Sequence, residues 1–596
     1  MTYGAGGTSA RHPLVGLVPV DLRGSELVLS PTKPGDSRST SLDPVKSLLA
    51  GGTIQQSEEL LLALTTGRFY THEFIGRRLA KATIDAISGR LGSPIRIVDP
   101  FCGDGRLVSW FLEALSGNPM ASHTEFSVEL WDCDGVALEA ASNRVKALAG
   151  SVKTLSVASY HWDTFSNARD RFGMFDVVLT NPPWELLKPD PRQLRGMDEE
   201  RARDYSRSLR DEDRRLSALY PASRPRVRYA GWGLNLSRCG TEVALSLLKP
   251  DGFAGIVVPA SLFADSSSSG IRQILATSFQ LLSMDYFPSE ARLFPGTDQP
   301  AVATLVRRRA SSGVSLQLTV FDAALHARDR SRLKISNTEL ERTDFVIPGQ
   351  LSARSYPIFR KLWRFCEFSA LEGVASKSLV AGRELDETRI GERLADSGTH
   401  LFVKGRMVTR FGTNLESAKF VIPGTGIPTS AGHWRIAWRD VSRTTQARRV
   451  QASLIPPGVV TGNSLSVAYF RDDNMHRLRA LLLLMTSAVF EFQVRMYLAT
   501  PHISLASVRK GRLPTLQSKA LVDGLARICD KCMTGKRSAL IEGEVRSAQA
   551  YGITRVELET ILAEFGRLSC AEKSAIVDSS CWDSVPSWVS SSTNPG

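Results

Sequence analysis

Residues 97 to 105 read Ile-Val-Asp-Pro-Phe-Cys-Gly-Asp-Gly, and this stretch decides the fold class of the chain. Its first residues end an apolar run that is typical of a short strand, and a helical pattern begins directly after Gly105. Glycines at such a junction let the backbone approach a ligand closely, and the free amide groups at a helix start suit a carboxylate or a phosphate. We therefore expect a ligand-binding turn whose members are Asp99, Phe101, Gly103 and Gly105.

The segments on both sides of this turn alternate between strands and helices. Apolar spacing predicts strands over 95–98, 126–131, 175–179 and 255–258, and helices over 74–87, 107–115, 136–148 and 241–248. Such alternation predicts an α/β fold with a mostly parallel sheet between two layers of helices. Ligands of this fold bind at the carboxyl ends of the strands.

Two carboxylates follow the glycine turn in an order that suits an adenosine pocket. Asp132 ends the next predicted strand, where it can accept hydrogen bonds from ribose hydroxyls. Asp163 stands close to Phe165, so an acceptor for an adenine amino group lies beside an aromatic face. The glycine turn alone would be an ordinary connection, and each acid alone a surface residue or a helix cap. Together they predict a site for an adenosine-containing cofactor.

A second decisive segment, 176–184, reads Asp-Val-Val-Leu-Thr-Asn-Pro-Pro-Trp and ends another predicted strand. Pro182 and Pro183 fix the backbone and remove two N–H donors, so the Pro182 carbonyl can face a ligand as an acceptor. Asn181 supplies a second acceptor, and Trp184 supplies a flat surface. This combination fits a planar base that carries an NH2 group.

Together these motifs resemble those of gamma-class adenine-specific DNA methyltransferases. The catalytic motif of that class has the form Asn/Asp/Ser-Pro-Pro-aromatic, and residues 181–184 look like its adenine-specific version. Residues 67–71, Gly-Arg-Phe-Tyr-Thr, resemble the Gly-x-Phe-Tyr-Thr-Pro element of the class, with His72 in place of the proline. The resemblance implies that Tyr70 and Thr71 help to hold the methionine part of S-adenosyl-L-methionine.

The resemblance continues along the chain and implies a fold and a reaction. Segments 248–263 and 293–308 look like later motifs of the class, which makes Phe294 a second stacking surface, after Trp184, for a base flipped out of the duplex. The implied fold is a Rossmann-like class I methyltransferase domain. The implied reaction transfers a methyl group from S-adenosyl-L-methionine to the exocyclic amino group of adenine in double-stranded DNA.

A second, mixed α+β region with short strands and turns is predicted over 376–515. Its motifs are similar to the target-recognition half of adenine methyltransferases from type IIS restriction-modification systems, and they lie at 382–386, 404–407, 436–443, 461–464, 490–495 and 500–504. Residues 401–450 hold nine Lys or Arg against two acids, an excess that favours DNA phosphates. We accordingly expect DNA contacts from Lys404, Arg406, Arg439, Arg443, Arg448 and Arg449.

The complete expected organisation has five parts. They are a partly irregular N-terminal extension (1–57), the methyltransferase domain (58–330), a connector (331–375), the recognition domain (376–515) and a helical C-terminal region with a frayed tail (516–596). Within the second part, the charged stretch 185–235 reads as a solvated helix with many ion pairs.

Bulk composition fits this interpretation. The 596 residues include 42% hydrophobic and 23% charged residues, which is ordinary for a globular protein, and the net charge of +13 favours a polyanionic partner. No apolar run reaches the ~18 residues of a membrane span, and the start lacks the order of a signal peptide. We expect a cytoplasmic prokaryotic protein with reduced thiols. Cys529-Asp-Lys-Cys532 lacks a second pair, so we expect no zinc site.

Two other functions remain open from the sequence. One is an amino-methyltransferase that acts on RNA or on a protein glutamine, because the Asn-Pro-Pro-aromatic motif also serves those substrates. The other is a DNA-binding subunit without catalytic activity. No acidic metal-binding cluster with a nuclease lysine is recognised, so we expect any restriction endonuclease to be a separately encoded partner.

Overall fold

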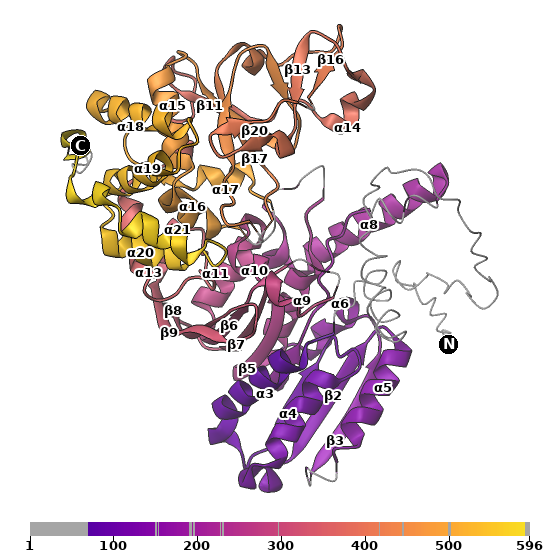
Figure 1. Cartoon of the computed structure of the whole chain (residues 1–596). Helices are drawn as coiled ribbons and strands as arrows, with labels where there is room; N and C mark the ends of the chain where they lie inside the picture. The colour runs from indigo at the N-terminus through magenta and orange to yellow at the C-terminus, as the bar shows by residue number, and fades with distance from the viewer. Residues whose placement is uncertain are drawn as a thin grey trace, which may run out of the picture.

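The computed structural model describes residues 70–590 except for 150, 151, 153, 190–193, 195, 196, 227, 229–231, 296, 298, 417, 444, 445 and 499–501. The expected N-terminal extension (1–57), the start of the expected methyltransferase domain and residues 67–69 of the Gly-Arg-Phe-Tyr-Thr element lie outside the described residues. The described chain forms an N-terminal half built on one large sheet and a C-terminal half of two four-stranded sheets, two two-stranded sheets and a group of helices (Figure 1).

A nine-stranded sheet organises the N-terminal half, in the order β3–β2–β1–β4–β5–β7–β6–β8–β9. The strands β3, β2, β1, β4 and β5 are parallel, whereas β7 lies antiparallel between β5 and β6. In chain order the strands are β1 (Ile95–Asp99), β2 (Phe126–Asp132), β3 (Leu155–His161), β4 (Phe175–Thr180), β5 (Leu248–Pro259), β6 (Gln280–Phe287), β7 (Ala301–Arg307), β8 (Gly313–Phe321) and β9 (Ala327–Ser336).

Helices cover both faces of this sheet, as expected of an α/β fold. One face carries α3 (Glu73–Ile87), α4 (Arg106–Ser116) and α5 (Gly135–Lys146), whose apolar residues share one core cluster. The other face carries α9 (Leu236–Leu247) and α11 (Ser269–Thr277), which belong to a second cluster. The helices α3, α4, α5 and α9 and the strands β1, β2 and β4 confirm the predicted elements.

The sheet also differs from the prediction. The apolar spacing does not predict β3, β6, β7, β8 or β9, and these strands extend the sheet at both edges. Because β9 ends at Ser336, the expected boundary at residue 330 falls inside a strand. Two of the inward-facing positions of β9 are the polar residues Asp329 and Ser331, and these interrupt the apolar alternation that identifies a strand in sequence.

The charged stretch contains the long helix α8 (Glu199–Leu219), which projects from the N-terminal half (Figure 1). Ion pairs along it join Arg203 to Glu199 at 2.8 Å and Arg207 to Asp204 at 3.0 Å, so the predicted ion-paired helix is confirmed. The inner face of α8 is not solvated as predicted, because Glu212 and Asp213 are buried there.

The C-terminal half contains two four-stranded sheets and several helices. The first sheet consists of β11 (Leu379–Gly382), β20 (Leu465–Phe470), β17 (Arg435–Arg439) and β18 (Ala452–Ile455), and the second of β12 (Leu394–Ala395), β16 (Lys419–Val421), β13 (His400–Val403) and β19 (Val459–Thr461). The helices are α15 (Met475–Met485), α16 (Ala488–Arg495), α17 (Leu505–Arg509), α18 (Lys519–Cys532), α19 (Arg537–Ala550) and α20 (Arg555–Ala563). The predicted mixture of short strands followed by helices is thus observed.

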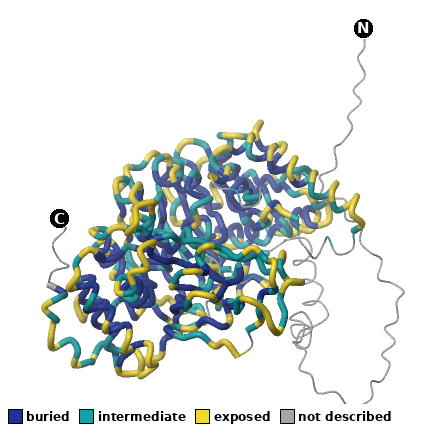
Figure 2. The backbone as a smooth tube through the Cα atoms, turned by 90° about the horizontal axis from the view of Figure 1, so that it is seen from above, coloured by how far each residue is buried: buried dark blue, intermediate teal, exposed yellow. Residues whose placement is uncertain are grey.

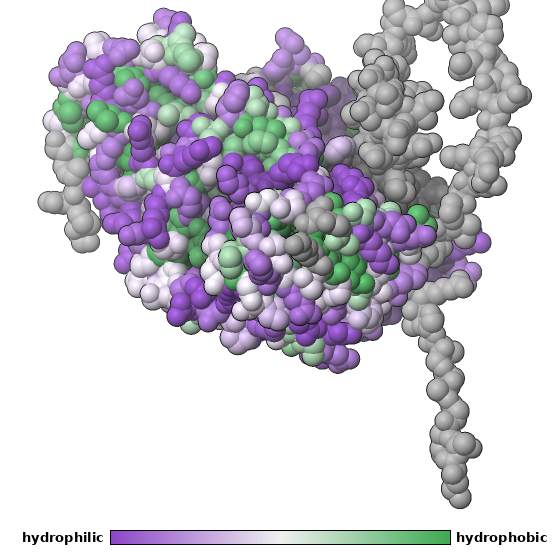
Figure 3. Space-filling model, turned by 90° about the horizontal axis from the view of Figure 1, so that it is seen from below, coloured by the Kyte–Doolittle hydropathy of each residue, from purple (hydrophilic) through white to green (hydrophobic). Residues whose placement is uncertain are grey.

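The two halves share a hydrophobic core. One cluster of buried side chains runs from α9 and β6 through the connector to α15, α18 and α20. Figure 2 shows buried residues inside both halves. Many residues on the face seen in Figure 3 are hydrophilic. Among the described residues, every helix is too short or too polar to cross a membrane.

Candidate active site

The glycine turn after β1 is built by backbone hydrogen bonds and two left-handed glycines. The Phe101 amide donates to Asp99 Oδ1 at 3.1 Å, and the Cys102 amide donates to the Trp131 carbonyl of β2 at 3.0 Å. Gly103 and Gly105 have φ values of 52° and 75°, a region that favours glycine. A Cβ on Gly105 would lie 2.9 Å from the Ala141 backbone, so glycine also lets α4 approach α5.

This turn meets the end of β2 directly. The Gly103 amide donates to Asp132 Oδ2 at 2.8 Å, and Oδ1 of the same carboxylate accepts from the Asp134 amide at 2.8 Å. Tyr70 lies over Gly103, since a Cβ there would stand 3.1 Å from the Tyr70 ring. The Arg106 guanidinium covers Tyr70 at 4.5 Å from the ring centroid. The structure therefore brings together the predicted cofactor residues of three separate segments, and Thr71 follows Tyr70 as a buried residue.

Asp99 lies buried beneath the turn, with 2% of its surface exposed. Burial raises the pKa of Asp99 to about 7, although the hydrogen bond from the Phe101 amide opposes the rise, and the charges of Asp132 and Asp104 add to it. A carboxyl with a pKa near 7 is half protonated at neutral pH, so a cation placed beside it would favour loss of the proton.

Asp163 and Phe165 lie on the next connection, at the start of the short helix α6 (Thr164–Asn167). Phe165 is buried with its ring centroid 5.2 Å from that of Phe101, so the two predicted aromatic residues meet. Asp163 caps α6 by accepting from the Phe165 amide at 3.1 Å. Its other oxygen accepts from Arg215 of α8 at 3.3 Å, a partner that the sequence did not indicate.

The Asn-Pro-Pro-Trp segment follows β4 and lies beside the glycine turn, because β1 and β4 are adjacent parallel strands. The Trp184 indole N–H donates to Asn181 Oδ1 at 3.0 Å, which orients the Asn181 carboxamide. Trp184 and Phe294 are both buried, with ring centroids 4.4 Å apart. The predicted stacking residues are therefore together, but they contact each other and leave no room for a base between them.

Gly240 in α9 is a site residue that sequence reasoning missed. A Cβ at this position would collide with Pro182 and would lie 3.1 Å from the Phe101 ring. Because residue 240 is glycine, α9 can pack closely against both Pro182 of the catalytic segment and Phe101 of the cofactor segment. The only signal in the sequence is a glycine within an apolar helix, which usually disfavours the helix.

In the C-terminal half, the described residues of five predicted recognition motifs form one cluster of loops, whereas the sixth motif, 490–495, lies in the buried helix α16. The Gly405 amide donates to Ser464 Oγ at 2.9 Å, and Asn463 donates to Asp386 at 2.8 Å. Isolated bridges join Leu385 to Gly462 and Val441 to His502. Motifs that are up to about 120 residues apart in sequence therefore meet at one surface.

Four of the six predicted DNA contacts lie on or next to this loop cluster. Arg406 and Arg443 are exposed, and Lys404 is paired with Glu387. Arg439 is half-buried and donates to the Val408 and Arg406 carbonyls at 2.5 and 3.2 Å. Burial lowers the pKa of Arg439, which stays a cation at neutral pH.

The other two, Arg448 and Arg449, require a correction. Both are buried, and the Arg448 guanidinium is enclosed by the carboxylates of Glu491 at 3.0 Å and Glu544. The Arg449 amide donates to Glu491 at 2.8 Å, and its Nε donates to the Ser442 carbonyl at 3.2 Å. These arginines hold the interior together, so the prediction that they contact DNA phosphates is wrong for this conformation.

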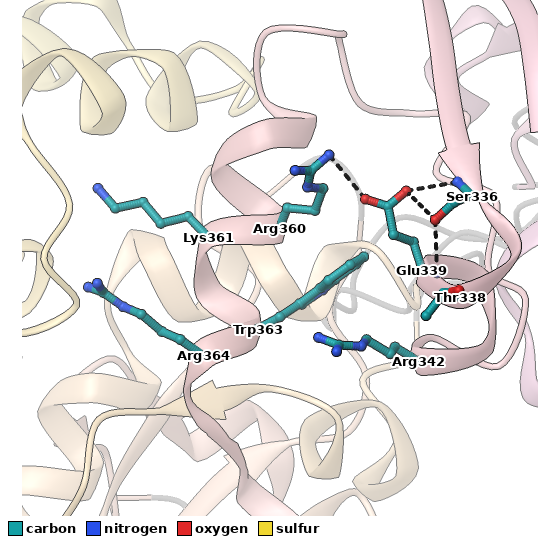
Figure 4. A pocket seen from close by; sticks show the side chains of 8 residues that line it. All are labelled: Ser336, Thr338, Glu339, Arg342, Arg360, Lys361, Trp363 and Arg364. Atoms are coloured by element: carbon teal, nitrogen blue, oxygen red, sulfur yellow. Dashed lines mark hydrogen bonds and ion pairs between the residues drawn. The ribbon is translucent and has the colours of Figure 1, made fainter. Parts of the chain in front are cut away.

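One cavity and the two cysteines of the Cys-x-x-Cys motif lie away from the predicted site. A cavity of about 540 Å³ lies where the connector meets the helix after β9, and its lining residues are Ser336, Thr338, Glu339, Arg342, Arg360, Lys361, Trp363 and Arg364 (Figure 4). Arg360 pairs there with Glu339 at 3.0 Å. Cys529 and Cys532 are buried in α18, and burial raises the pKa of both thiols.

The sheet order, with antiparallel β7 between β5 and β6 and a glycine turn after β1, is that of the α/β fold of class I methyltransferases. The fold class predicted from the sequence is thereby confirmed. No protein-family model matches the chain.

Comparison with known proteins points to restriction-modification methyltransferases. The type II methyltransferase M.BanIII of Aneurinibacillus aneurinilyticus is 26% identical over 261 residues, which are 41% of this chain and 39% of that protein. The match thus spans about two fifths of the relative's own length. It agrees with the class of protein that the sequence motifs predict.

Two solved structures share the fold over 81% of this chain, each with a TM-score of 0.50. One is the DrdV–DNA complex, at 10% identity and over 60% of that chain. The other is a nuclease-deletion mutant of the type ISP restriction-modification enzyme LlaGI in complex with a DNA substrate mimic, at 11% identity and over 49% of that chain. At these identities the likeness concerns the fold alone.

Proposed function

We propose that the chain is a site-specific DNA methyltransferase that transfers a methyl group from S-adenosyl-L-methionine to the exocyclic amino group of adenine. The observation that carries this proposal is the oriented Asn181 carboxamide, placed after β4 and beside the glycine turn after β1. An acceptor for an amino group and a pocket for an adenosine cofactor thus share the carboxyl edge of one sheet.

Asn181 and Pro182 would act on the amino nitrogen of the target. The lone pair of this nitrogen is delocalised into the adenine ring, which makes it a weak nucleophile. Hydrogen bonds from the amino group to Asn181 Oδ1 and to the Pro182 carbonyl would localise the pair and stabilise the charge that develops during transfer. Asn181 Oδ1 has a second lone pair besides the one that accepts from Trp184, so both bonds can coexist.

The cofactor would lie along the turn between Tyr70, Gly103 and Asp132. Its sulfonium group supplies an activated methyl, so the protein needs chiefly to hold nitrogen, methyl and sulfur in line. Asp132 would accept from the ribose hydroxyls, Phe101 and Phe165 would flank the adenine ring, and Asp163 would accept from its amino group. Thr71, Asp99 and Gly105 complete the pocket.

The target base would have to leave the duplex, at a cost of a few kcal/mol. Trp184 and Phe294 would recover part of that cost by stacking, which is worth about 1–3 kcal/mol per base. Since the two rings contact each other, they must separate when the base enters. Pro183 keeps the loop between Asn181 and Trp184 stiff during this change.

The C-terminal half would bind duplex DNA through its loop cluster, with Arg406, Arg443, Arg439 and Lys404 near the phosphates. Within a prokaryotic cytoplasm, such an enzyme would protect host DNA as part of a restriction-modification or phage-defence system, beside a separately encoded endonuclease.

Mapping of modified adenines tests the proposal. Genomic DNA from a methylation-deficient host that expresses the chain should carry N6-methyladenine at one short sequence, and DNA from a host that expresses Asn181→Ala should not. Methylated RNA or methylated protein glutamine without modified DNA would favour the alternative substrates. Specific DNA binding without any methylated product would favour a subunit without catalytic activity.

A first prediction concerns Asp132. Asp132→Ala should weaken S-adenosyl-L-methionine binding by about tenfold to a hundredfold, because it removes a ribose acceptor and an acceptor of the Gly103 amide. Titration calorimetry with the cofactor gives this value, and affinity for duplex DNA without cofactor should stay the same. Loss of DNA affinity with intact cofactor binding would contradict the assigned role.

A second prediction concerns pH. Asp99 has a pKa of about 7 without ligand, and a cationic cofactor nearby would lower it, so binding should release a proton below neutral pH. Cofactor affinity should therefore rise from pH 6 to pH 7.5 by up to about tenfold per unit and then level off. Asp99→Asn should remove this slope. Calorimetry in buffers of different ionisation enthalpy counts the protons released, and an equal slope in the variant would place its origin elsewhere.

A further inference from the structure

A buried carboxylate, Asp440, joins the recognition loops. It follows β17 and has 3% of its side chain exposed. Its Oδ1 accepts from the Ser466 hydroxyl of β20 at 2.6 Å, its amide donates to the Ser464 carbonyl at 3.0 Å, and its carbonyl accepts from the Ile503 amide at 2.7 Å. Its Oδ2 forms an ion pair with Arg383, which follows β11.

Arg383 is the exposed member of this arrangement. Its side chain is 55% exposed, although one edge of its guanidinium is held by the buried Asp440. The side chain of the next residue, Glu384, is fully buried, accepts from the Thr461 amide at 2.7 Å and forms an ion pair with Arg435 at 2.9 Å. The backbone of Arg383 is therefore fixed on one side by β11 and on the other by Glu384.

The surface around Arg383 borders the methyltransferase half. Ser504 follows Ile503 closely, and it lines one small cavity together with Ala264 and Asp265 of the N-terminal half. In Figure 1, β17 and β20 likewise lie on the side of the C-terminal half that faces the N-terminal half. DNA bound for methylation would thus lie within reach of a side chain that projects from these loops.

We propose that Arg383 reads a base edge in the recognition sequence and that Asp440 is the residue that positions it. Guanine is the base that a guanidinium recognises best, through paired hydrogen bonds to O6 and N7 in the major groove. A guanidinium held by a buried carboxylate is preorganised, since it loses little freedom when the DNA arrives.

The charge balance favours a base over a phosphate. Asp440 largely neutralises Arg383, which weakens its attraction to a phosphate but leaves its outward N–H donors and their direction unchanged. Arg406 and Arg443 are exposed and, among the described residues, form no ion pair with a carboxylate, so they suit the phosphate role better. Lysine cannot replace arginine at a base edge that is read by two parallel hydrogen bonds.

This inference rests on the proposed methylation of DNA, so the experiment begins by mapping the site that the complete wild-type chain modifies. Duplexes with each base pair of that site replaced in turn are then methylated by wild type, Arg383→Ala and Arg383→Lys. Arg555→Ala is the matched control, because Arg555 is 50% exposed and paired with one carboxylate, Asp578, away from the loops.

Both Arg383 variants should lose about tenfold to a hundredfold of kcat/KM on the wild-type site and should stop discriminating at one base pair only. Asp440→Asn should relax the same base pair, and the salt dependence of DNA binding should not change in any of the variants. Equal losses on all duplexes with a flatter salt dependence, or wild-type behaviour of Arg383→Lys, would identify a phosphate contact and overturn the inference. Unchanged preference in Arg383→Ala would also overturn it, whereas a wild-type chain that methylates no DNA would instead refute the proposed function.

Discussion

Replacement of Asn181 by alanine should reduce methylation of duplex DNA by at least about 10²-fold, in line with the loss of one preorganised hydrogen-bonding group at a reacting centre. The variant removes the acceptor that we assign to the target amino group, but it removes no cofactor contact. Single-turnover assays with labelled S-adenosyl-L-methionine measure the loss, and calorimetry should show cofactor affinity close to that of wild type.

The control for this experiment is Asn118→Ala. Asn118 also uses its side-chain oxygen, which accepts from the Met120 amide at 3.0 Å, but it lies at a surface turn away from the site. It should keep full activity. A folded Asn181→Ala protein that retained turnover would remove Asn181 from the mechanism and with it the main support for the proposed function.

Replacement of Arg448 by methionine should lower stability by about 3–5 kcal/mol, because it removes the cation that the buried carboxylates of Glu491 and Glu544 share. Arg495 beside Glu491 and Arg410 beside Glu544 then remain as their cationic partners. Urea unfolding followed by tryptophan fluorescence measures the effect on the C-terminal half. Arg406→Met, at an exposed arginine of the loop cluster, is the control and should change stability little. If the two variants were equally stable, the structural role of Arg448 would be refuted and Arg448 would again be a candidate DNA contact.

The same network predicts a response to acid. Burial opposes the ionisation of Glu491, but the charges of Arg495 and Arg448 overcome it and lower its pKa to about 2. A lowered pKa stabilises the fold above the ordinary value of 4.5, and this contribution disappears as the pH falls toward 2. Wild type should therefore lose more stability than Arg448→Met when the pH falls below 4.5.

Local patterns predicted the centre of the methyltransferase half well. The elements β1, α4 and β4 carry strong apolar periodicity, and their bounds agree with the prediction within one or two residues. The motif residues Asp99, Gly103, Asp132 and Asn181 lie where the ends of neighbouring strands bring them together, because parallel strands place these ends at one edge.

Pairings between distant residues could not be predicted in this way. The basic excess in 401–450 counts Arg448 like any other arginine, whereas its partners lie 43 and 96 residues further along the chain. Likewise, nothing in the sequence of α8 shows that Arg215 reaches Asp163, 52 residues before it. An excess of basic residues in a stretch of sequence predicts a basic surface only if those side chains are exposed.

The position of Glu544 affects how the protein can be dissected. This residue belongs to α19, in the helices that follow the expected end of the recognition domain at 515, yet its carboxylate lies between Arg410 and Arg448 of that domain. A polypeptide cut at residue 515 would remove the carboxylate that pairs with Arg410 and one of the two that pair with Arg448. It would also expose the apolar surface that α18 and α19 cover. Limited proteolysis should accordingly release neither piece as a stable fragment, and exchange of sequence specificity between relatives should succeed only when the helices to residue 563 are transferred together with the loops.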